Sequence, residues 1–259
     1  MQFTTIVVED DGPLRMIALH RPERRNAMTP EMQSELLAAL QDTAASSSRV
    51  LVFTGAGEAF CAGLDLSALR GMQDQGAAGN RADAERIARL FRTLYELPVP
   101  TIAAVNGAAI AGGAGLAFLC DFTLAVPAAK FGFTEVRIGF VPALVSAFIA
   151  PQIGEKKCRD LLLTGRIFDA EEGHGLGLVN QVVPADELMQ RTKELAQVLI
   201  ANSPQSMSAT KRLLSAESKE RLDAAVAHAL EANAAARETE DFREGIAAFL
   251  EKRKPQWKK

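Results

Sequence analysis

Residues 101–126, TIAAVNGAAIAGGAGLAFLCDFTLAV, decide the fold. The first five residues form a short apolar run of strand length, and Gly112, Gly113 and Gly115 then open a second apolar run of helical length. The closing FTLAV is a further strand candidate. A buried strand that passes through a glycine-containing turn into a helix and then another strand is typical of an α/β domain with parallel strands.

The same pattern extends upstream of this stretch. Alternating runs at 3–10 and 14–20 flank the turn DDGP and predict an antiparallel hairpin. Thr29 and Pro30 have the residue types of a helix N-cap and a first helical position, so a helix is expected over 29–44. A buried strand at 49–55 and a helix at 83–97 follow. Strand, loop and helix therefore repeat, which favours an α/β core of parallel sheets.

Downstream, a short strand is expected at 130–133, and the pattern becomes helical after about residue 184. No strand candidate remains there, so the sequence predicts a helical C-terminal module. The polar, glycine-rich residues 66–84 fit no periodic element, and we expect an irregular segment that is mobile or functional.

The composition limits the class of protein. The chain has 259 residues, 48% of them hydrophobic, and a formal charge of −3, which allows a large core but gives no general attraction to nucleic acid or anionic membranes. Its three cysteines lack CxxC spacing and its N-terminus lacks the blocks of a signal peptide. The most apolar window, 139–154, is too short to span a bilayer. We therefore expect a cytoplasmic protein with reduced thiols and without nucleic-acid or membrane partners.

Two glycine-containing segments, 54–66 and 106–121, each follow a buried strand. Chain that leaves a strand and enters a helix exposes backbone N–H groups, and two such turns facing each other can form an oxyanion hole. The alternative is that the glycines only permit tight packing, which each segment taken alone favours. Neither segment has the spacing of a phosphate-binding loop or of GxGxxG.

Few side chains have the pattern of a catalytic group. The three histidines lack partners at metal or triad spacing, so no metal site is expected, and Cys61 fits a small buried filler better than a thiolate. Glu135 lies among apolar residues in KFGFTEVRIGF, where burial would raise its pKa toward neutrality. A solvent-facing glutamate, or one paired with Arg137, is the open alternative.

Four segments in this order resemble the crotonase superfamily, the enoyl-CoA hydratases and isomerases: RPERRNAMTPEM, VFTGAGEAFCAGLDL, PTIAAVNGAAIAGGAGLAFLCDFTLAVPAAKFGFTEVRIGFVP and LLTGRIFDAEEGHGLGLVNQVVP. The resemblance covers the chain from about residue 14 to its end. It implies a spiral core of ββα units with the acyl-CoA site over residues 1–195. It further implies a helical trimerisation region over 196–259, in a homotrimer or a dimer of trimers.

The resemblance also implies roles for residues that match the family's motifs. The backbone N–H groups of Leu64 and Gly112 would hold a thioester enolate, and Glu135 would be the acid/base. Coenzyme A, as part of the substrate and with no further cofactor, would contact Glu23, Arg24, Arg25, Ala62, Leu66, Gly115, Phe249 and Lys252. In the family, the positions of Phe249 and Lys252 often come from a neighbouring subunit. The basic clusters at residues 21–25 and 252–259 are therefore either solvated faces or contacts for phosphate groups.

One departure bears on the reaction. Hydratases with two glutamates carry an acid where this sequence has Gly115, so Glu135 is the single family acid that remains. The resemblance favours hydration of a 2-enoyl-CoA. The lone acid keeps Δ3,Δ2-enoyl-CoA isomerisation open, together with a 3-methylglutaconyl-CoA-type hydratase and a catalytically weak acyl-CoA-binding subunit.

Overall fold

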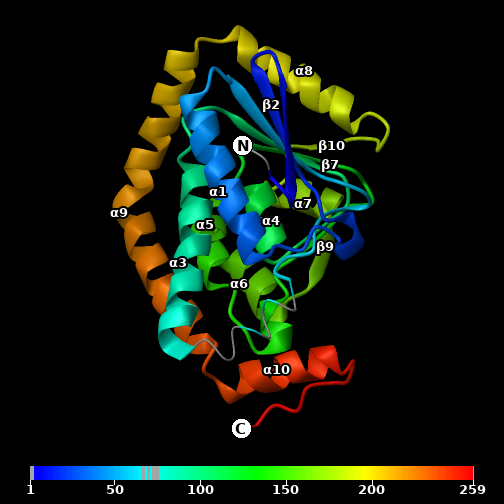
Figure 1. Cartoon of the computed structure of the whole chain (residues 1–259), viewed down its shortest axis with the longest axis vertical. Helices are drawn as coiled ribbons and strands as arrows, with labels where there is room; N and C mark the ends of the chain where they lie inside the picture. The colour runs from blue at the N-terminus through cyan, green and yellow to red at the C-terminus, as the bar shows by residue number, and fades with distance from the viewer. Residues whose placement is uncertain (1–2, 66–67, 69–70, 72–75, 259) are drawn as a thin grey trace.

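The computed structural model describes residues 3–65, 68, 71 and 76–258, and its strands form two sheets (Figure 1). The larger sheet has the strand order β1 (Ile6–Asp11), β2 (Leu14–Leu19), β3 (Val50–Gly55), β5 (Thr101–Val105), β7 (Phe122–Ala125) and β10 (Gln181–Val182). The first two strands are antiparallel and all other neighbours in this sheet are parallel. The smaller sheet has the order β4 (Ala59–Cys61), β6 (Ala108–Ile110), β8 (Lys130–Gly132) and β9 (Ile167–Asp169).

A repeated unit builds both sheets. In the pairs β3/β4, β5/β6 and β7/β8, the first strand joins the larger sheet and the second joins the smaller one. A helical segment follows each pair: α3 (Gly76–Tyr95), α4 (Gly112–Phe118), and the 3-10 helix η2 (Glu135–Ile138) with α5 (Ala143–Ile153). This arrangement confirms the expected spiral of ββα units. Because β4, β6 and β8 run parallel, the chain leaves them at one edge of the small sheet, where the site lies.

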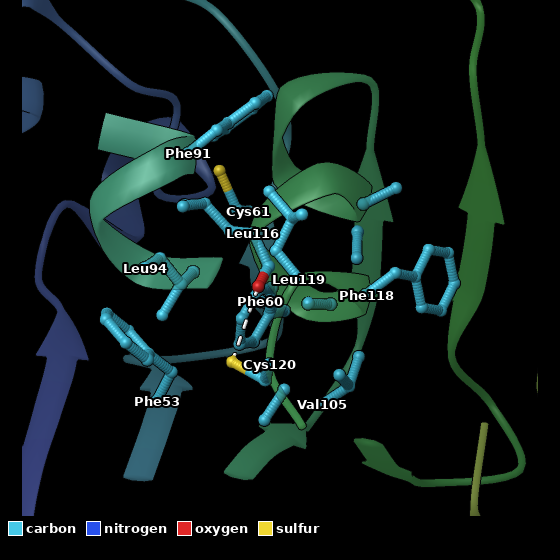
Figure 2. Packing of buried hydrophobic residues seen from close by; sticks show 14 of the residues in the cluster. Phe53, Phe60, Cys61, Phe91, Leu94, Val105, Leu116, Phe118, Leu119 and Cys120 are labelled. Atoms are coloured by element: carbon cyan, nitrogen blue, oxygen red, sulfur yellow. Dashed lines mark hydrogen bonds between the residues drawn. The ribbon is translucent and has the colours of Figure 1, made fainter. Parts of the chain in front are cut away.

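Helix α4 lies in the centre of the hydrophobic core (Figure 2). All its residues from Gly113 to Phe118 are buried, as expected for a helix that is apolar on every side. Leu116 lies among side chains from β3, β4, β5 and α3, of which Phe53, Phe60, Val105, Phe91 and Leu94 are labelled in Figure 2. The Phe118 ring points away from these side chains and packs against Phe131 of β8 and Phe168 of β9. The core therefore holds α4 rigidly beneath the site.

The remaining elements are mostly helical: η1 (Pro22–Arg24), α1 (Pro30–Ala45), α6 (Glu155–Thr164), α7 (Ala170–Leu176), α8 (Leu188–Ala201), α9 (Pro204–Ala236) and α10 (Glu240–Leu250). The long helix α9 packs against α3 and α5, and α10 lies across one end of the molecule (Figure 1). Leu222, Val226 and Ala229 of α9 belong to the main core. The expected boundary at residues 195 and 196 falls inside α8, and a trimerisation role for 196–259 stays a prediction.

Most elements predicted from the sequence are confirmed. The hairpin pairs Ile6 with Leu19, and the Thr29 side chain accepts a hydrogen bond of 3.2 Å from the Met32 N–H at the start of α1. The expectation of an irregular segment is wrong over 76–84, where α3 has already begun. Residues 66, 67, 69, 70 and 72–75 lie outside the described residues. In the described part of the chain, no helix combines the length and the hydropathy needed to cross a bilayer.

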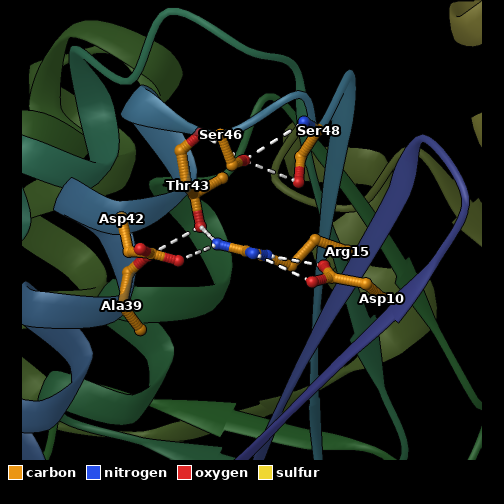
Figure 3. Close-up of polar contacts among 7 residues, drawn as sticks. All are labelled: Asp10, Arg15, Ala39, Asp42, Thr43, Ser46 and Ser48. Carbon is orange, nitrogen blue, oxygen red and sulfur yellow. Dashed lines mark hydrogen bonds and ion pairs between the residues drawn. The ribbon is translucent and has the colours of Figure 1, made fainter. Parts of the chain in front are cut away.

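A buried guanidinium joins the N-terminal hairpin to helix α1 (Figure 3). Arg15 Nε lies 2.7 Å from Asp10 Oδ1, and its Nη1 lies 2.6 Å from Asp42 Oδ2 on α1. The same Nη1 donates to Thr43 Oγ1 at 3.3 Å. These bonds raise the pKa of Arg15 and lower the pKa of the Asp10 carboxyl. The hairpin is therefore fixed to the core by charge as well as by strand pairing.

We expect Arg15→Met to lower the free energy of unfolding by about 1–2 kcal/mol, because charged hydrogen bonds are lost and no equivalent replaces them. The cost stays moderate because Asp10 and Asp42 are about half exposed, at 53% and 49%, and return to water. Urea unfolding measures the change. Arg159→Met is the control, since its ion pair with Glu155 is exposed and should contribute little. Equal losses in the two variants would contradict the role of Arg15.

Candidate active site

A cavity of about 690 Å³ opens at the edge of the small sheet. Its wall is made by residues within the segments 21–28, 62–65, 110–112 and 134–145, together with Ile87, Phe91, Asn233, Phe249 and Leu250. Its wall includes the arginines of the N-terminal loop and apolar side chains of α3 and α5. The cavity lining thus combines cationic and apolar groups.

The two glycine-containing turns contact each other through their backbones. A Cβ atom on Gly113 would lie 2.3 Å from the Cys61 carbonyl oxygen, so no side chain fits there. Gly63 has a left-handed φ of +92°, and a Cβ on it would lie 2.9 Å from the Ile110 carbonyl oxygen. The glycines therefore allow the end of β4 and the start of α4 to pack at a distance that any larger residue would prevent.

Two residues of these turns, Leu64 and Gly112, have N–H groups without an acceptor among the described residues. The Met28 N–H donates to the Gly63 carbonyl at 2.7 Å and the Asp65 N–H to the Met28 carbonyl at 2.8 Å, which leaves the Leu64 N–H outside this bridge. Gly112 is the first residue of α4, so its N–H has no partner within the helix. Neither N–H donates to any residue in the described part of the chain. Both residues line the cavity.

The peptide between Ala111 and Gly112 is held in an uncommon conformation. Ala111 has φ 52° and ψ −121°, a combination that residues with a side chain rarely adopt. Its own N–H donates to the Gly132 carbonyl at 2.7 Å, which fixes the strand side of the turn. Strained backbone of this kind is concentrated at functional sites, where the surrounding structure maintains it.

Glu135 is a buried acid at the start of η2. Its side chain lines the cavity, the residue is 9% exposed, and Oε2 has no hydrogen-bond partner among the described residues. Burial raises the pKa of Glu135 to about 7, against a smaller lowering effect of its own N–H. The alternatives of a solvent-facing glutamate and of a pair with Arg137 are therefore wrong for the described structure.

Helix α10 covers the turn that carries Glu135. A Cβ on Gly245 would lie 2.2 Å from the Ile138 carbonyl carbon, so the helix backbone touches the end of η2. The rings of Phe242 and Phe140 are 5.1 Å apart and extend this contact. The C-terminal helix of the same chain thus packs against the element that carries Glu135.

Gly115 lies behind the cavity wall, where the site has no room for a second acid. A Cβ at this position would lie 2.6 Å from Val145 Cγ1 and 3.0 Å from Phe91 Cζ. Both side chains are buried and both line the cavity. The volume that a carboxyl side chain would need is therefore filled by apolar groups.

The structure brings most of the predicted site residues to one cavity. Those in its wall are Arg24, Arg25, Ala62, Leu64, Gly112, Glu135 and Phe249. Glu23, Gly115 and Lys252 are described but do not line it, and Leu66 lies outside the described residues. Phe249 belongs to the wall of its own chain's cavity and is 50% exposed. The binding and catalytic roles of these residues stay predictions.

Sequence reasoning missed Asn26, which joins the first loop to the first glycine turn. Its Nδ2 donates to the carbonyls of Ala56 and Ala59 at 2.9 and 2.8 Å, and its Oδ1 accepts from the Arg21 N–H at 2.8 Å. The residue is completely buried and has a φ of 54°. The available signal was an asparagine in the loop before α1, since this residue tolerates the left-handed region.

Cys61 is confirmed as a buried filler. Its Sγ donates to the Asn26 carbonyl at 3.2 Å, and burial raises the pKa of the thiol to about 12. The thiol therefore stays protonated near neutral pH.

Comparisons with known proteins agree with this geometry. A family model described as enoyl-CoA hydratase/isomerase matches residues 10–259. A protein from Thermus thermophilus, whose name places it among the enoyl-CoA hydratases, is 45% identical over 253 residues, which is 97% of this chain and 100% of that protein. A protein from Clostridium acetobutylicum named short-chain-enoyl-CoA hydratase is 32% identical and aligns over 98% of this chain and 97% of its own.

Solved structures show the same similarity. The crystal structure of an enoyl-CoA hydratase/isomerase from Xanthobacter autotrophicus Py2 matches with a TM-score of 0.89 at 30% identity, over 96% of this chain and 97% of that one. An enoyl-CoA hydratase structure from Mycobacterium avium subsp. paratuberculosis K-10 matches with a TM-score of 0.89 at 25% identity, over the full length of both chains.

The contact between the two turns leads to a first prediction for the site. Gly113→Ala should separate β4 from α4 and abolish turnover of acyl-CoA substrates, since the added Cβ meets backbone that cannot move aside. Gly175→Ala in α7 is the matched control, because a Cβ there meets nothing within 4 Å. Circular dichroism and a thermal melt check folding, and steady-state kinetics measures turnover. Full activity of a folded Gly113→Ala variant would contradict this geometry.

The burial of Glu135 predicts a pH dependence of stability. The folded pKa, about 7, lies above the ordinary value of 4.5, so the unfolded chain loses this proton first. Relative to Glu135→Gln, the wild type should lose roughly 3 kcal/mol of unfolding free energy between pH 4.5 and 7, and no more above pH 7. Urea unfolding of both proteins across this range measures the difference. A constant difference would show that the carboxyl titrates normally.

Proposed function

Because this chain belongs to the enoyl-CoA hydratase/isomerase family of the crotonase superfamily, we propose that it hydrates a 2-enoyl-CoA thioester. The observation that carries the proposal is one cavity lined by the buried Glu135 and by Leu64 and Gly112, whose N–H groups have no acceptor among the described residues. Two donors near one acid suit a reaction in which negative charge develops on a carbonyl oxygen while a proton moves nearby.

The two N–H groups would bind the thioester carbonyl oxygen. When water adds to C3, the electrons of the double bond move toward the carbonyl and the oxygen gains negative charge. Donors fixed by packed backbone need no rearrangement as this charge forms, so they stabilise the enolate more than the ground state. The close contact of Gly113 with Cys61 supports such a fixed arrangement.

Glu135 would transfer the proton. Its carboxylate accepts a proton from the water whose oxygen bonds to C3, and the resulting acid delivers a proton to C2. One water is then added across the double bond, and Glu135 ends in its starting state. A pKa of about 7 supports this role, because the ionised and protonated forms are both populated near neutral pH.

Arginines at the cavity mouth suit the phosphate groups of coenzyme A. Arg24 and Arg25 are exposed and lie in the cavity wall. Guanidinium groups bind phosphate through paired, charge-assisted hydrogen bonds. Arg21 serves a different purpose, since its Nη1 lies 2.9 Å from Asp65 Oδ2.

A second candidate, Δ3,Δ2-enoyl-CoA isomerisation, is favoured by one observation. The apolar packing of Phe91 and Val145 against Gly115 leaves Glu135 without a second acid at that position. One carboxylate suffices to remove a proton from C2 and return it to C4, with the same enolate stabilised by the same N–H groups. Hydration demands more, because Glu135 must also orient the water.

Two substrates separate the candidates. With crotonyl-CoA, hydration removes the absorbance of the enoyl thioester, whereas with a 3-enoyl-CoA, isomerisation produces it. We expect the first reaction, and we expect Glu135→Gln to lower its kcat by about 10² or more. Turnover of the 3-enoyl-CoA alone would establish the isomerase instead. A near-wild-type rate in the variant would remove Glu135 from the mechanism, and tight acyl-CoA binding without product would indicate a binding subunit.

A further inference from the structure

An asparagine interrupts the apolar stripe of helix α9. The buried residues of this helix are Leu222, Val226, Ala229, Asn233 and Ala236, whose spacing places them on one face. Asn233 is 4% exposed and lies in the cavity wall. A buried amide costs free energy unless it forms hydrogen bonds, so its presence in this stripe requires an explanation.

The protein supplies no partner for this side chain in the described residues. Asn233 Oδ1 has no hydrogen-bond partner there. One turn further on, Arg237 Nη2 lies 2.7 Å from Asp83 Oδ2 of α3, with side chains 0% and 2% exposed. The Arg237 guanidinium also lies 5.7 Å from the centre of the Phe140 ring. These contacts fix the end of α9, so Asn233 is held in the cavity wall.

The position of α9 shows which lining elements lie next to Asn233. Helix α9 packs against α3 and α5 (Figure 1). Those two helices contribute Ile87, Phe91, Leu144 and Val145 to the wall, whereas Arg24 and Arg25 belong to the N-terminal loop. Helix α9 therefore holds Asn233 beside the two helices that supply this apolar lining, which suits an acyl chain.

We propose that Asn233 binds a hydroxyl group on the acyl chain, at a carbon beyond those that react; this rests on the proposed acyl-CoA function. The amide has a C=O that accepts a hydrogen bond and an NH2 that donates one, and a hydroxyl group can form both bonds. An unsubstituted alkyl chain would exclude water from Oδ1 and give it no hydrogen bond, which weakens binding because an unpaired buried polar atom costs free energy. A carboxylate on the chain would lose its hydration beside an uncharged amide.

The test compares matched acyl-CoA esters with and without a hydroxyl at successive carbons from C4 outward. Calorimetry with the saturated esters gives Kd without any reaction, and kinetics with the 2-enoyl esters gives kcat/KM. At one carbon, we expect the wild type to prefer the hydroxylated ester by about tenfold in both measurements. Asn233→Leu should abolish this preference and leave the unsubstituted ester bound at least as well.

Asn80→Leu is the matched control. Asn80 of α3 is also buried, at 3% exposure, and its Oδ1 is also unpaired in the described structure, but it does not line the cavity. The preference should survive in this variant. If Asn233→Leu does not fold, Asn233→Ala replaces it.

A wild type without preference at any carbon, or a preference that survives in the Asn233 variant, would overturn the proposal. Failure of the proposed reaction is seen separately. In that case no ester turns over, while the hydroxyl-dependent Kd and its loss on substitution still support the role of Asn233. Normal turnover of both esters at equal efficiency overturns the role of Asn233 alone.

Discussion

The contact between the backbones at Gly113 and Cys61 is the constraint on which the site depends. A Cβ would lie 2.3 Å from a carbonyl oxygen there, so the two turns meet only because one of them has no side chain. Leu64 and Gly112, whose N–H groups have no acceptor among the described residues, line the same cavity for that reason. Leu116 and Phe118 anchor α4 in the hydrophobic core, so the helix cannot move away from β4. The donors are thus positioned by the core of the fold, which is the condition for electrostatic preorganisation.

Local signals made much of the fold predictable. Apolar runs, the Thr29 cap and the glycines each predict the conformation of the residues next to them in the sequence. The elements inferred from them are present. Strands β4, β6, β8 and β9 have only three residues, too few for a period to be recognised, and of these β8 alone was predicted. The first turns of α3, residues 76–82, were not recognised as helical because they contain Gly76, Gly79 and the buried Asn80. Asp83 pairs with Arg86 on the same helix and with Arg237, 154 positions away, and no local pattern predicts the distant partner.

Residues of the candidate site were predictable where the signal is a glycine-containing turn or an acid among aromatic residues. Glycine motifs and Glu135 carry such signals, whereas the packing that surrounds them does not. The amide of Asn26 donates to carbonyl groups that lie 30 and 33 residues further along the chain. Helix α10, near the end of the chain, packs against η2. Sequence alone could name Gly115 as the position of a missing acid. Only the structure shows that Val145 and Phe91 occupy the space.

The apolar surroundings of Glu135 set the pKa of this single acid. Where two carboxylates share a site, their repulsion raises one pKa; here desolvation alone raises the pKa of Glu135 to about 7. Helix α10 packs against the far end of the element that carries this acid, where Gly245 allows its backbone to touch Ile138 of η2. A side chain at Gly245 would meet the η2 backbone and separate the two elements. The C-terminal helix therefore helps to hold η2, and with it Glu135, in place through backbone contact.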